Sequence, residues 1–507
     1  VDMEIYGVKS KMAFYPHRNY GYDMVEFSSI DEYFTALENN GIILQASKRR
    51  QKILNEFKAI EQNSGLKIEL DEDLLDEVVA ITEMPTALIG SFEKEFLEVP
   101  SEVIVTSMKE NQRYFPLYDQ NGKLSNHFVV VSNAISSDSN LIIKGNEKVL
   151  RARLSDAKFF WESDLASEFS SAKLKNITYL AGLGSMYDKE IREREIAREL
   201  AKIYEKELKY EFGGEFIDEL DRAVMLSKAD LTTAMVYEFT DLQGIMGSYY
   251  AQYRKENHFV VEAIKEQYLP NKEGSECPKS YFSSMVALSA KLDTLMGLFS
   301  INKIPTGNKD PYALRRAAAG IIKIVLNLNI EFDVKNILSL IAKNYTAFDL
   351  GLLENFIYDR LYTMYDANPS VIKACLNSGV SDIKRLNSAI IALDEITKNS
   401  EFKENFSTFK RLANIIKDNQ ILAVDEKLME HDSERALYAA FNSLNLDISD
   451  TKRYLEALFN LKPAIDNYFD NVMINSDDEK IKANRISIIG QIYQAFLKVA
   501  DIKEITV

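Results

Sequence analysis

Cysteine and histidine are both scarce in this chain of 507 residues, which contains two cysteines and four histidines. Cys277 and Cys375 are far apart in the sequence and form no Cys-x-x-Cys pair, so we expect neither a disulfide framework nor a zinc site of that spacing. Such sparing use of cysteine is typical of proteins that work in a reducing compartment. We therefore expect the protein to be cytoplasmic.

The few histidines argue against a metal-dependent phosphohydrolase of the histidine-aspartate class. That class needs imidazoles and carboxylates that converge on one ion within a helical bundle. The segment that best fits its helical motif reads Lys228-Ala229-Asp230, with alanine where a histidine is required, and no histidine lies between residues 128 and 257. A later Lys291-Leu292-Asp293 resembles the distal aspartate segment of the class. We predict no metal site, and we expect Asp230 and Asp293 to pair with lysines or cap helices.

Motifs for nucleotide binding and nucleophilic catalysis are also missing. The chain contains no Walker-type loop, no Gly-x-Gly-x-x-Gly and no Gly-x-Ser-x-Gly, so we expect no catalytic site and no cofactor on this chain. No apolar run approaches the roughly 20 residues that cross a bilayer, so no membrane partner is expected. The start, Val1-Asp2-Met3-Glu4, lacks the regions of a signal peptide and an initiator methionine, which indicates an N-terminally truncated chain.

The chain has fewer positively charged residues than negatively charged ones. There are 61 lysines and arginines against 77 aspartates and glutamates, which gives a net charge of −16. This balance argues against a nonspecific polyanion binder, but a specific RNA binder needs only local basic patches. With 46% hydrophobic and 27% charged residues, the composition is that of a globular protein. The length allows roughly three or four domains.

The first 165 residues mix helical and strand patterns, which predicts an α+β domain. Asp119-Gln120-Asn121-Gly122 is an Asn-Gly hairpin signal between two apolar runs, and the β-branched run from Glu102 to Thr106 indicates a further strand. The hairpin strands are expected at 113–118 and 124–132, and helices at 30–40, 47–63, 71–80 and 146–160.

From about residue 166 the strand signals fade and helical periodicity takes over. Apolar residues recur at spacings of four and three from Leu220 to Ala234, which predicts one helix over 217–237. Further helices are expected at 258–268, 281–298 and 311–327, and a last one carries Ile489, Ile492, Phe496 and Val499. We divide the chain into segments 1–165, 166–335, 336–400 and 401–507.

The segment from Gly307 to Gly320 combines a helix start with a local excess of positive charge. Asp310 is a good N-cap, and Pro311 suits the first helical position because its missing N–H costs nothing there. The basic residues here are Lys309, Arg315 and Arg316. Such a helix start suits an anionic ligand such as a phosphate backbone, and the alternative is a solvated basic face.

A second basic segment, Gly145 to Leu154, contains Lys148, Arg151 and Arg153. Two arginines two residues apart diverge by about 200° on a helix, so they do not serve one groove together. We expect one arginine to contact RNA and the other to pair with Glu147 or Asp156. The run from Asn111 to Phe115 offers amides and rings that suit unpaired bases, although a strand end with core aromatics is the simpler interpretation.

Two polar residues, Asn484 and Arg485, precede the last apolar stripe and are further candidates for RNA contact. The alternative for Arg485 is an ion pair. Its candidate partners are Asp466, Asp470 and Asp478.

Several of these segments together resemble the β subunit of bacterial heterotetrameric glycyl-tRNA synthetase. The resemblance runs in order over almost the whole chain, and the combination is far more specific than any one motif. The matching segments are 111–116, 145–154, 156–161, 226–231, 238–247, 307–320, 469–473, 484–485 and 499–502.

The resemblance implies a division of labour. The α subunit carries the class II site that activates glycine with ATP and magnesium, and the β subunit binds tRNA-Gly within an α2β2 assembly. It also implies the fold: an editing-type α+β module at 1–165, a degenerate histidine-aspartate-type helical domain at 166–335, a helical linker at 336–400 and an anticodon-binding-type helical domain at 401–507. Asn484 and Arg485 would then lie near the anticodon. The alternatives are the phosphohydrolase discussed above and a helical scaffold that binds only protein.

Overall fold

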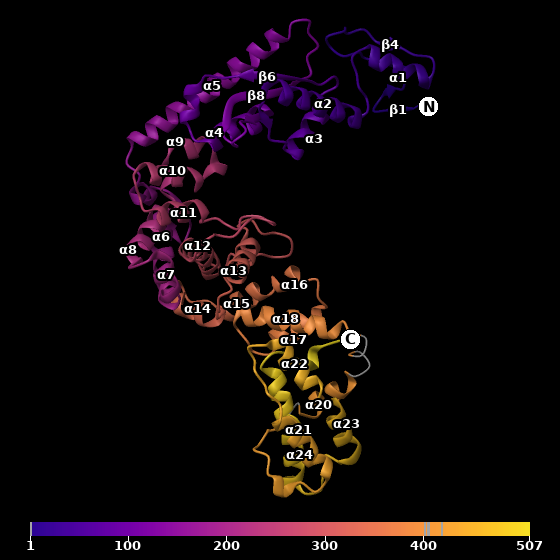
Figure 1. The fold of residues 1–507 in the computed structure, drawn as a ribbon, viewed down its shortest axis with the longest axis vertical. Helices are drawn as coiled ribbons and strands as arrows, with labels where there is room; N and C mark the ends of the chain where they lie inside the picture. The colour runs from indigo at the N-terminus through magenta and orange to yellow at the C-terminus, as the bar shows by residue number, and fades with distance from the viewer. Residues whose placement is uncertain (1–2, 400–401, 403–405, 417–418, 507) are drawn as a thin grey trace. The chain divides into compact units, whose positions relative to one another are not determined.

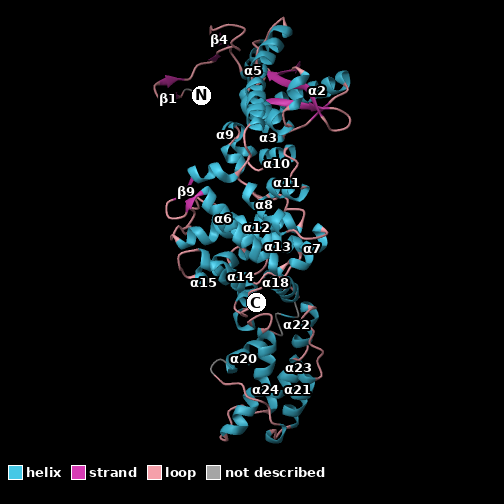
Figure 2. Cartoon of the chain, turned by 90° about the vertical axis from the view of Figure 1, so that its left-hand side faces the viewer, coloured by secondary structure: helices cyan, strands magenta, loops and turns pink. Residues whose placement is uncertain are grey.

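The computed structural model describes residues 3–399, 402, 406–416 and 419–506 (Figure 1). It is mainly helical, with a small sheet region in the N-terminal part (Figure 2). The chain forms two compact units: unit 1 is Val1–Ser170 with Ala229–Lys255, and unit 2 is Ser171–Lys228 with Glu256–Val507. The mainly helical class with an N-terminal sheet is therefore confirmed, while the four-segment division stays a prediction.

The centre of unit 1 is a four-stranded antiparallel sheet in the order β5-β7-β8-β6. Its strands are β5 (Lys67–Ile68), β6 (Thr86–Ser91), β7 (Tyr114–Tyr118) and β8 (Leu124–Ser132). Two short hairpins precede it, β1 (Glu4–Ile5) with β2 (Val8–Lys9) and β3 (Ala13–Phe14) with β4 (Val25–Glu26). The predicted β7–β8 hairpin is confirmed. Gly122 takes a φ of +77° in its loop, a conformation that glycine adopts without strain.

Helices cover this sheet and bury its apolar side chains. Phe57 and Phe115 meet edge to face with ring centroids 4.9 Å apart, which joins a helix to the central strand β7. The first helices are α1 (Ile30–Asn39), α2 (Ala46–Ser64) and α3 (Glu72–Ile81), close to the predicted ranges. The long α5 (Ser139–Ala166) extends beyond the predicted 146–160 at both ends.

The prediction of a strand at 102–106 is wrong, because these residues lie in α4 (Ser101–Thr106), which continues into a π-helical turn over Ser107–Gln112. Val103 and Ile104 are fully buried, so packing of these side chains overrides their β-branched preference for strands.

Unit 1 is completed by a return of the chain at 229–255, which contains α9 (Ala234–Glu238) and α10 (Ile245–Tyr253). The buried carboxylate of Asp164, on α5, accepts hydrogen bonds from the backbone N–H groups of Ala234 and Met235 at 2.9 and 3.0 Å. It thereby holds the first turn of α9 against α5.

Unit 2 begins as a helical bundle in which α12 packs against α6, α11 and α13, and α6 packs against α8. The prediction of one helix over 217–237 is wrong: α8 ends at Leu226 and a separate turn and α9 follow. The spacing of four and three does not mark one buried face, because Leu231 is half-buried and Ala234 is exposed, whereas Leu220 and Val224 are buried. The bundle helices are α6 (Met186–Ile203), α7 (Glu205–Phe212), α8 (Ile217–Leu226), α11 (His258–Glu266), α12 (Tyr281–Ser300) and α13 (Leu314–Leu328).

The rest of unit 2 is also helical. It comprises α14 (Val334–Ile341), α15 (Leu350–Tyr358), α16 (Leu361–Met364), α17 (Pro369–Leu376), α18 (Ile383–Thr397), α20 (Ser407–Ile416), α21 (Asp432–Asn442), α22 (Thr451–Phe459), α23 (Lys462–Asn471) and α24 (Glu479–Leu497). The predicted apolar stripe is buried, with its four members at most 3% exposed, but α24 ends at Leu497 and Val499 lies just after it. Within the described ranges, no helix combines the length and the apolar character needed to span a membrane.

Candidate nucleic-acid interface

The start of α13 differs from the predicted one. The helix begins at Leu314, three residues after Pro311, because Ala313 takes a left-handed φ of +55°. Asp310 still caps it: its two carboxylate oxygens accept hydrogen bonds from the backbone N–H groups of Leu314 and Arg315, both at 2.9 Å. The first amides of α13 are therefore occupied by the chain's own carboxylate, so any attraction for a phosphate here comes from the basic side chains and not from the bare helix N-terminus.

These side chains lie at the surface of unit 2. Lys309 and Arg316 are exposed and Arg315 is half-buried. Arg315 donates to the carbonyl oxygen of Gly307, and Arg316 donates through Nη1 to that of Asn271 at 3.2 Å. Among the residues that the structure describes, none of the three cations forms an ion pair with a carboxylate, so their charges are not neutralised by the protein.

The three cations of α5 have different surroundings. Lys148 is exposed and makes no ion pair within the described part of the chain. Arg151 pairs with Glu93 at 2.6 Å and Arg153 with Glu238 at 3.6 Å. The predicted partners, Glu147 and Asp156, are wrong.

The Oε1 atom of Glu147 instead accepts hydrogen bonds from the backbone N–H and the hydroxyl of Ser91, at 2.8 and 3.1 Å. This carboxylate joins α5 to the end of β6. Both arginine pairs are about half exposed. Such pairs contribute roughly 0–1 kcal/mol each, so a phosphate can compete for either guanidinium.

The run from Asn111 to Phe115 has the simpler of its two predicted roles. Tyr114 and Phe115 are 3% and 0% exposed in β7, so their rings belong to the core of unit 1 and not to a stacking surface. Arg113 takes a left-handed φ of +60° and pairs with Glu77 at 2.6 Å.

Asn484 and Arg485 are both only 4% exposed on α24. Arg485 pairs with Glu434 at 3.0 Å and Glu430 at 2.8 Å, instead of the three aspartates considered from the sequence. The side chain of Asn484 accepts from the N–H and donates to the carbonyl of Asp425, at 2.8 and 3.0 Å. Both side chains thus hold the segment 425–434 against α24, and a contact of either with tRNA stays a prediction.

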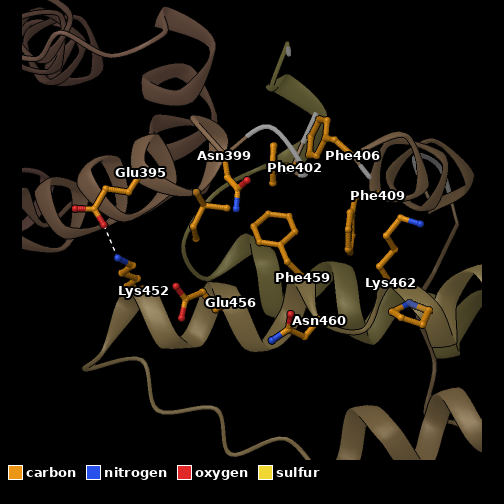
Figure 3. A pocket seen from close by; sticks show the side chains of 12 residues that line it. Glu395, Asn399, Phe402, Phe406, Phe409, Lys452, Glu456, Phe459, Asn460 and Lys462 are labelled. Atoms are coloured by element: carbon orange, nitrogen blue, oxygen red, sulfur yellow. Dashed lines mark hydrogen bonds and ion pairs between the residues drawn. The ribbon is translucent and has the colours of Figure 1, made fainter. Parts of the chain in front are cut away.

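Unit 2 also contains an aromatic pocket that was not predicted from the sequence. Figure 3 shows its lining, with the rings of Phe402, Phe406, Phe409 and Phe459 around a cavity of about 620 Å³. The ring of Phe402 stands edge to face with Phe459, with centroids 5.1 Å apart. At the rim, Glu395 and Lys452 form an ion pair at 2.6 Å. The i, i+4, i+7 spacing of the first three phenylalanines is the sequence signal that could have found it.

The two aspartates weighed as metal ligands have structural roles, as predicted. Asp230, in unit 1, caps α10: its Oδ2 accepts from the N–H groups of Gly244 and Gly247 at 2.6 and 3.0 Å. Asp293, in unit 2, pairs with Lys189 and Arg192, each at 2.7 Å.

Asp293 belongs to a buried ion network inside the helical bundle. The hydroxyl of Tyr345 donates to its Oδ1 at 2.7 Å, and Lys189 also pairs with Glu193 at 3.0 Å, which in turn pairs with Lys228 at 2.6 Å. Burial alone would raise the pKa of Asp293, but Lys189 and Arg192 hold it below its usual value. The network thus joins α6, α12 and Lys228, just after α8, through charge pairs.

Ala229, where the histidine-aspartate class requires a histidine, is 1% exposed in unit 1. Within the described ranges, no three His, Cys, Asp or Glu side chains lie together as a metal site would require.

Comparison with known proteins identifies the family. The family model described as "Glycyl-tRNA synthetase beta subunit" matches residues 1–377. The chain belongs to the glycyl-tRNA synthetase beta subunit family. A glycine–tRNA ligase beta subunit of Helicobacter pylori (strain Shi470) is 44% identical over 524 residues, which cover 100% of this chain and 74% of the relative. That of Clostridioides difficile (strain 630) is 34% identical over 100% of this chain and 75% of its own length.

A further relative, the glycine–tRNA ligase beta subunit of Streptococcus suis (strain 05ZYH33), is 38% identical over 96% of this chain and 72% of its own length. Membership confirms the resemblance drawn from the sequence motifs. The chain is a subunit of glycine–tRNA ligase, its role lies in glycyl-tRNA synthesis, and the enzyme has a partner subunit.

Proposed function

We propose that this chain is the tRNA-recognition subunit of glycine–tRNA ligase, which binds tRNA-Gly and presents its 3′ end to an α subunit that activates glycine. ATP and magnesium would bind at the α subunit, and the assembly would be α2β2 in the cytoplasm. The mechanism is positional, because holding the acceptor end at the reacting carbonyl replaces a bimolecular encounter with an oriented one.

The observation that carries the proposal is the presence of unneutralised cations on a chain of net charge −16. Lys309, Arg315 and Arg316 have no carboxylate partner among the described residues, and neither does Lys148 in unit 1. Arg151 and Arg153 add two weak, exposed pairs that a phosphate can displace. Contacts with phosphates would fix the register of the tRNA and leave base recognition to other groups. Asn484 and Arg485 are the weaker candidates, close to the anticodon.

The test is charging of tRNA-Gly by a separately purified α subunit, with and without this chain. Charging that depends on the chain supports the proposal. A filter-binding titration then separates recognition from assembly: a scaffold that binds only protein predicts no affinity for tRNA-Gly above that of another acidic protein.

Substitution of Lys309, Arg315 and Arg316, at and before the start of α13, sharpens this test. The triple variant Lys309→Ala, Arg315→Ala, Arg316→Ala should weaken tRNA binding and reduce the slope of log K against log salt by about one per lost phosphate contact. The matched control is Lys335→Ala, an exposed lysine on α14 outside these segments. An unchanged salt slope in the triple variant would contradict the assignment of these residues.

A further inference from the structure

A buried lysine without a counter-ion lies beside α13. Lys291, on α12, is 8% exposed, and its Nζ donates to the carbonyl oxygen of Tyr268 at 3.1 Å. No carboxylate within the described ranges pairs with it. A buried ammonium group is costly unless an opposite charge accompanies it. By comparison, the other buried lysines of this bundle, Lys189 and Lys228, both pair with Glu193.

The stem of Lys291 crosses α13 at Gly320. A Cβ atom at Gly320 would lie 2.7 Å from Cε and 3.1 Å from Cδ of Lys291, so glycine is what allows the lysine to lie against the helix. Arg316 is four residues before Gly320 and Lys323 three after it, and these spacings put all three positions on one face of α13. Lys291 therefore enters between two further cations.

The surroundings of this cluster are positive. Burial, together with the charges of Lys228 and Arg316, lowers the pKa of Lys291 to about 8, while the Cys277 thiol acts in the opposite direction. Burial raises the pKa of Cys277, and Lys323 and Lys291 both oppose that rise, so the two ammonium groups lie near the same thiol. Like charges gathered in this way repel one another unless an anion joins them.

We propose that Lys291, Arg316 and Lys323 form a binding site for a phosphate group. Lys291 supplies the buried end of the site, and the half-buried Lys323 and exposed Arg316 supply its open side. Two loop carbonyls, of Tyr268 and Asn271, take hydrogen bonds from Lys291 and Arg316 and so orient these donors. Assigning the phosphate to the tRNA backbone rests on the proposed function, whereas the site itself does not.

Inorganic phosphate is the first probe. Urea unfolding of the chain, followed by circular dichroism, is measured with and without phosphate for the wild type, Lys291→Met and the control Lys335→Met. A bound anion stabilises the folded state by mass action, whereas the general salting effect of phosphate acts on all three proteins alike. We expect the wild type and Lys335→Met to gain more from phosphate than Lys291→Met does. Equal gains in all three proteins would overturn the site.

Stability without phosphate provides a second criterion. Lys291→Met removes a buried charge that has no counter-ion, so this variant should be at least as stable as the wild type in phosphate-free buffer. A clear loss of stability would show that the ammonium group is structural and would overturn the proposal. Arg316→Ala, at an exposed position, should also lose the phosphate-specific gain without a change in folding.

Filter binding of tRNA-Gly distinguishes the source of the phosphate. If the site holds a tRNA phosphate, Lys291→Met should weaken binding by about 5- to 10-fold and reduce the salt slope by about one, and Lys335→Met should do neither. Unchanged tRNA affinity in a variant that has lost its phosphate response would overturn the tRNA assignment and leave a site for a free phosphate or a nucleotide. Absence of tRNA binding by every protein, including the wild type, would refute the proposed function alone.

Discussion

Replacing Asp293 by asparagine tests the buried ion network of unit 2. Asp293 is fully buried, and its carboxylate oxygens lie 2.7 Å from each of three donors: Lys189 Nζ, Arg192 Nε and the Tyr345 hydroxyl. Asparagine keeps the size and part of the hydrogen bonding but removes the negative charge. Glu193 then remains as the paired carboxylate for Lys189, and Arg192 loses its partner. Removing one member of a buried pair costs about 3–5 kcal/mol, because the remaining charge stays buried and uncompensated.

The location of the single tryptophan makes the assay specific. Trp161 lies on α5 of unit 1, stacked on Tyr250 with ring centroids 5.3 Å apart, so its fluorescence reports on unit 1. Circular dichroism reports on the helices of both units. With an m value of roughly 3 kcal/mol/M, the urea midpoint of unit 2 should fall by about 1 M or more. The fluorescence transition should stay in place.

The matched control is Asp470→Asn, an exposed aspartate on α23 of the same unit. Its effect should stay within about 0.5 kcal/mol. If Asp293→Asn unfolds at the same urea concentration as this control, the network does not hold the bundle together, and the reasoning from buried charge is wrong.

Three further predictions concern the pH dependence of this network and two other contacts in unit 2. Unit 2 should lose stability as the pH falls below about 4, because the folded-state pKa of Asp293 is lowered and the unfolded chain then takes up more protons. Urea midpoints measured by circular dichroism from pH 6 to 3 should therefore decline less in Asp293→Asn than in the wild type. Asp310→Ala should cost about 1–2 kcal/mol and speed amide hydrogen exchange at the start of α13, whereas Asp310→Asn should cost less. Arg485→Ala should cost about 3–5 kcal/mol in thermal unfolding by leaving the buried Glu434 unpaired, and equal stability to the wild type would show that the pair is dispensable.

Local periodicity predicted several helices and one hairpin, and it failed where tertiary packing decides. Helices α1, α2 and α3 and the β7–β8 hairpin follow from amphipathic spacing and turn residues near in sequence. The segment 102–106 shows the limit: its β-branched residues favour a strand, yet burial of Val103 and Ile104 places them in α4. The start of α13 shows another, since the left-handed Ala313 has no signal in the sequence.

The candidate site residues stay a prediction, and the ion-pair partners expected for its arginines from the sequence are wrong. The sequence indicates that Arg151 and Arg153 diverge, yet only the fold brings Glu93 and Glu238 to them. The same holds for Arg485, whose partners lie 51 to 55 residues away. Lys291 had an overlooked signal: it and Asp293 are the two charged residues in the otherwise uncharged sequence of α12.

The two charged residues of α12, Lys291 and Asp293, have different surroundings. Asp293 faces Lys189 and Arg192 and forms an ion pair with each. Lys291, two residues earlier on the helix and so about 160° away around it, faces Gly320 and no acid within the described ranges. If Lys291 served only packing, we would expect a carboxylate beside it, as Glu193 lies beside Lys189 and Lys228. In a chain with 77 acidic residues, a cluster of Lys291, Arg316 and Lys323 without one carboxylate partner in the described structure therefore favours an anion supplied from outside.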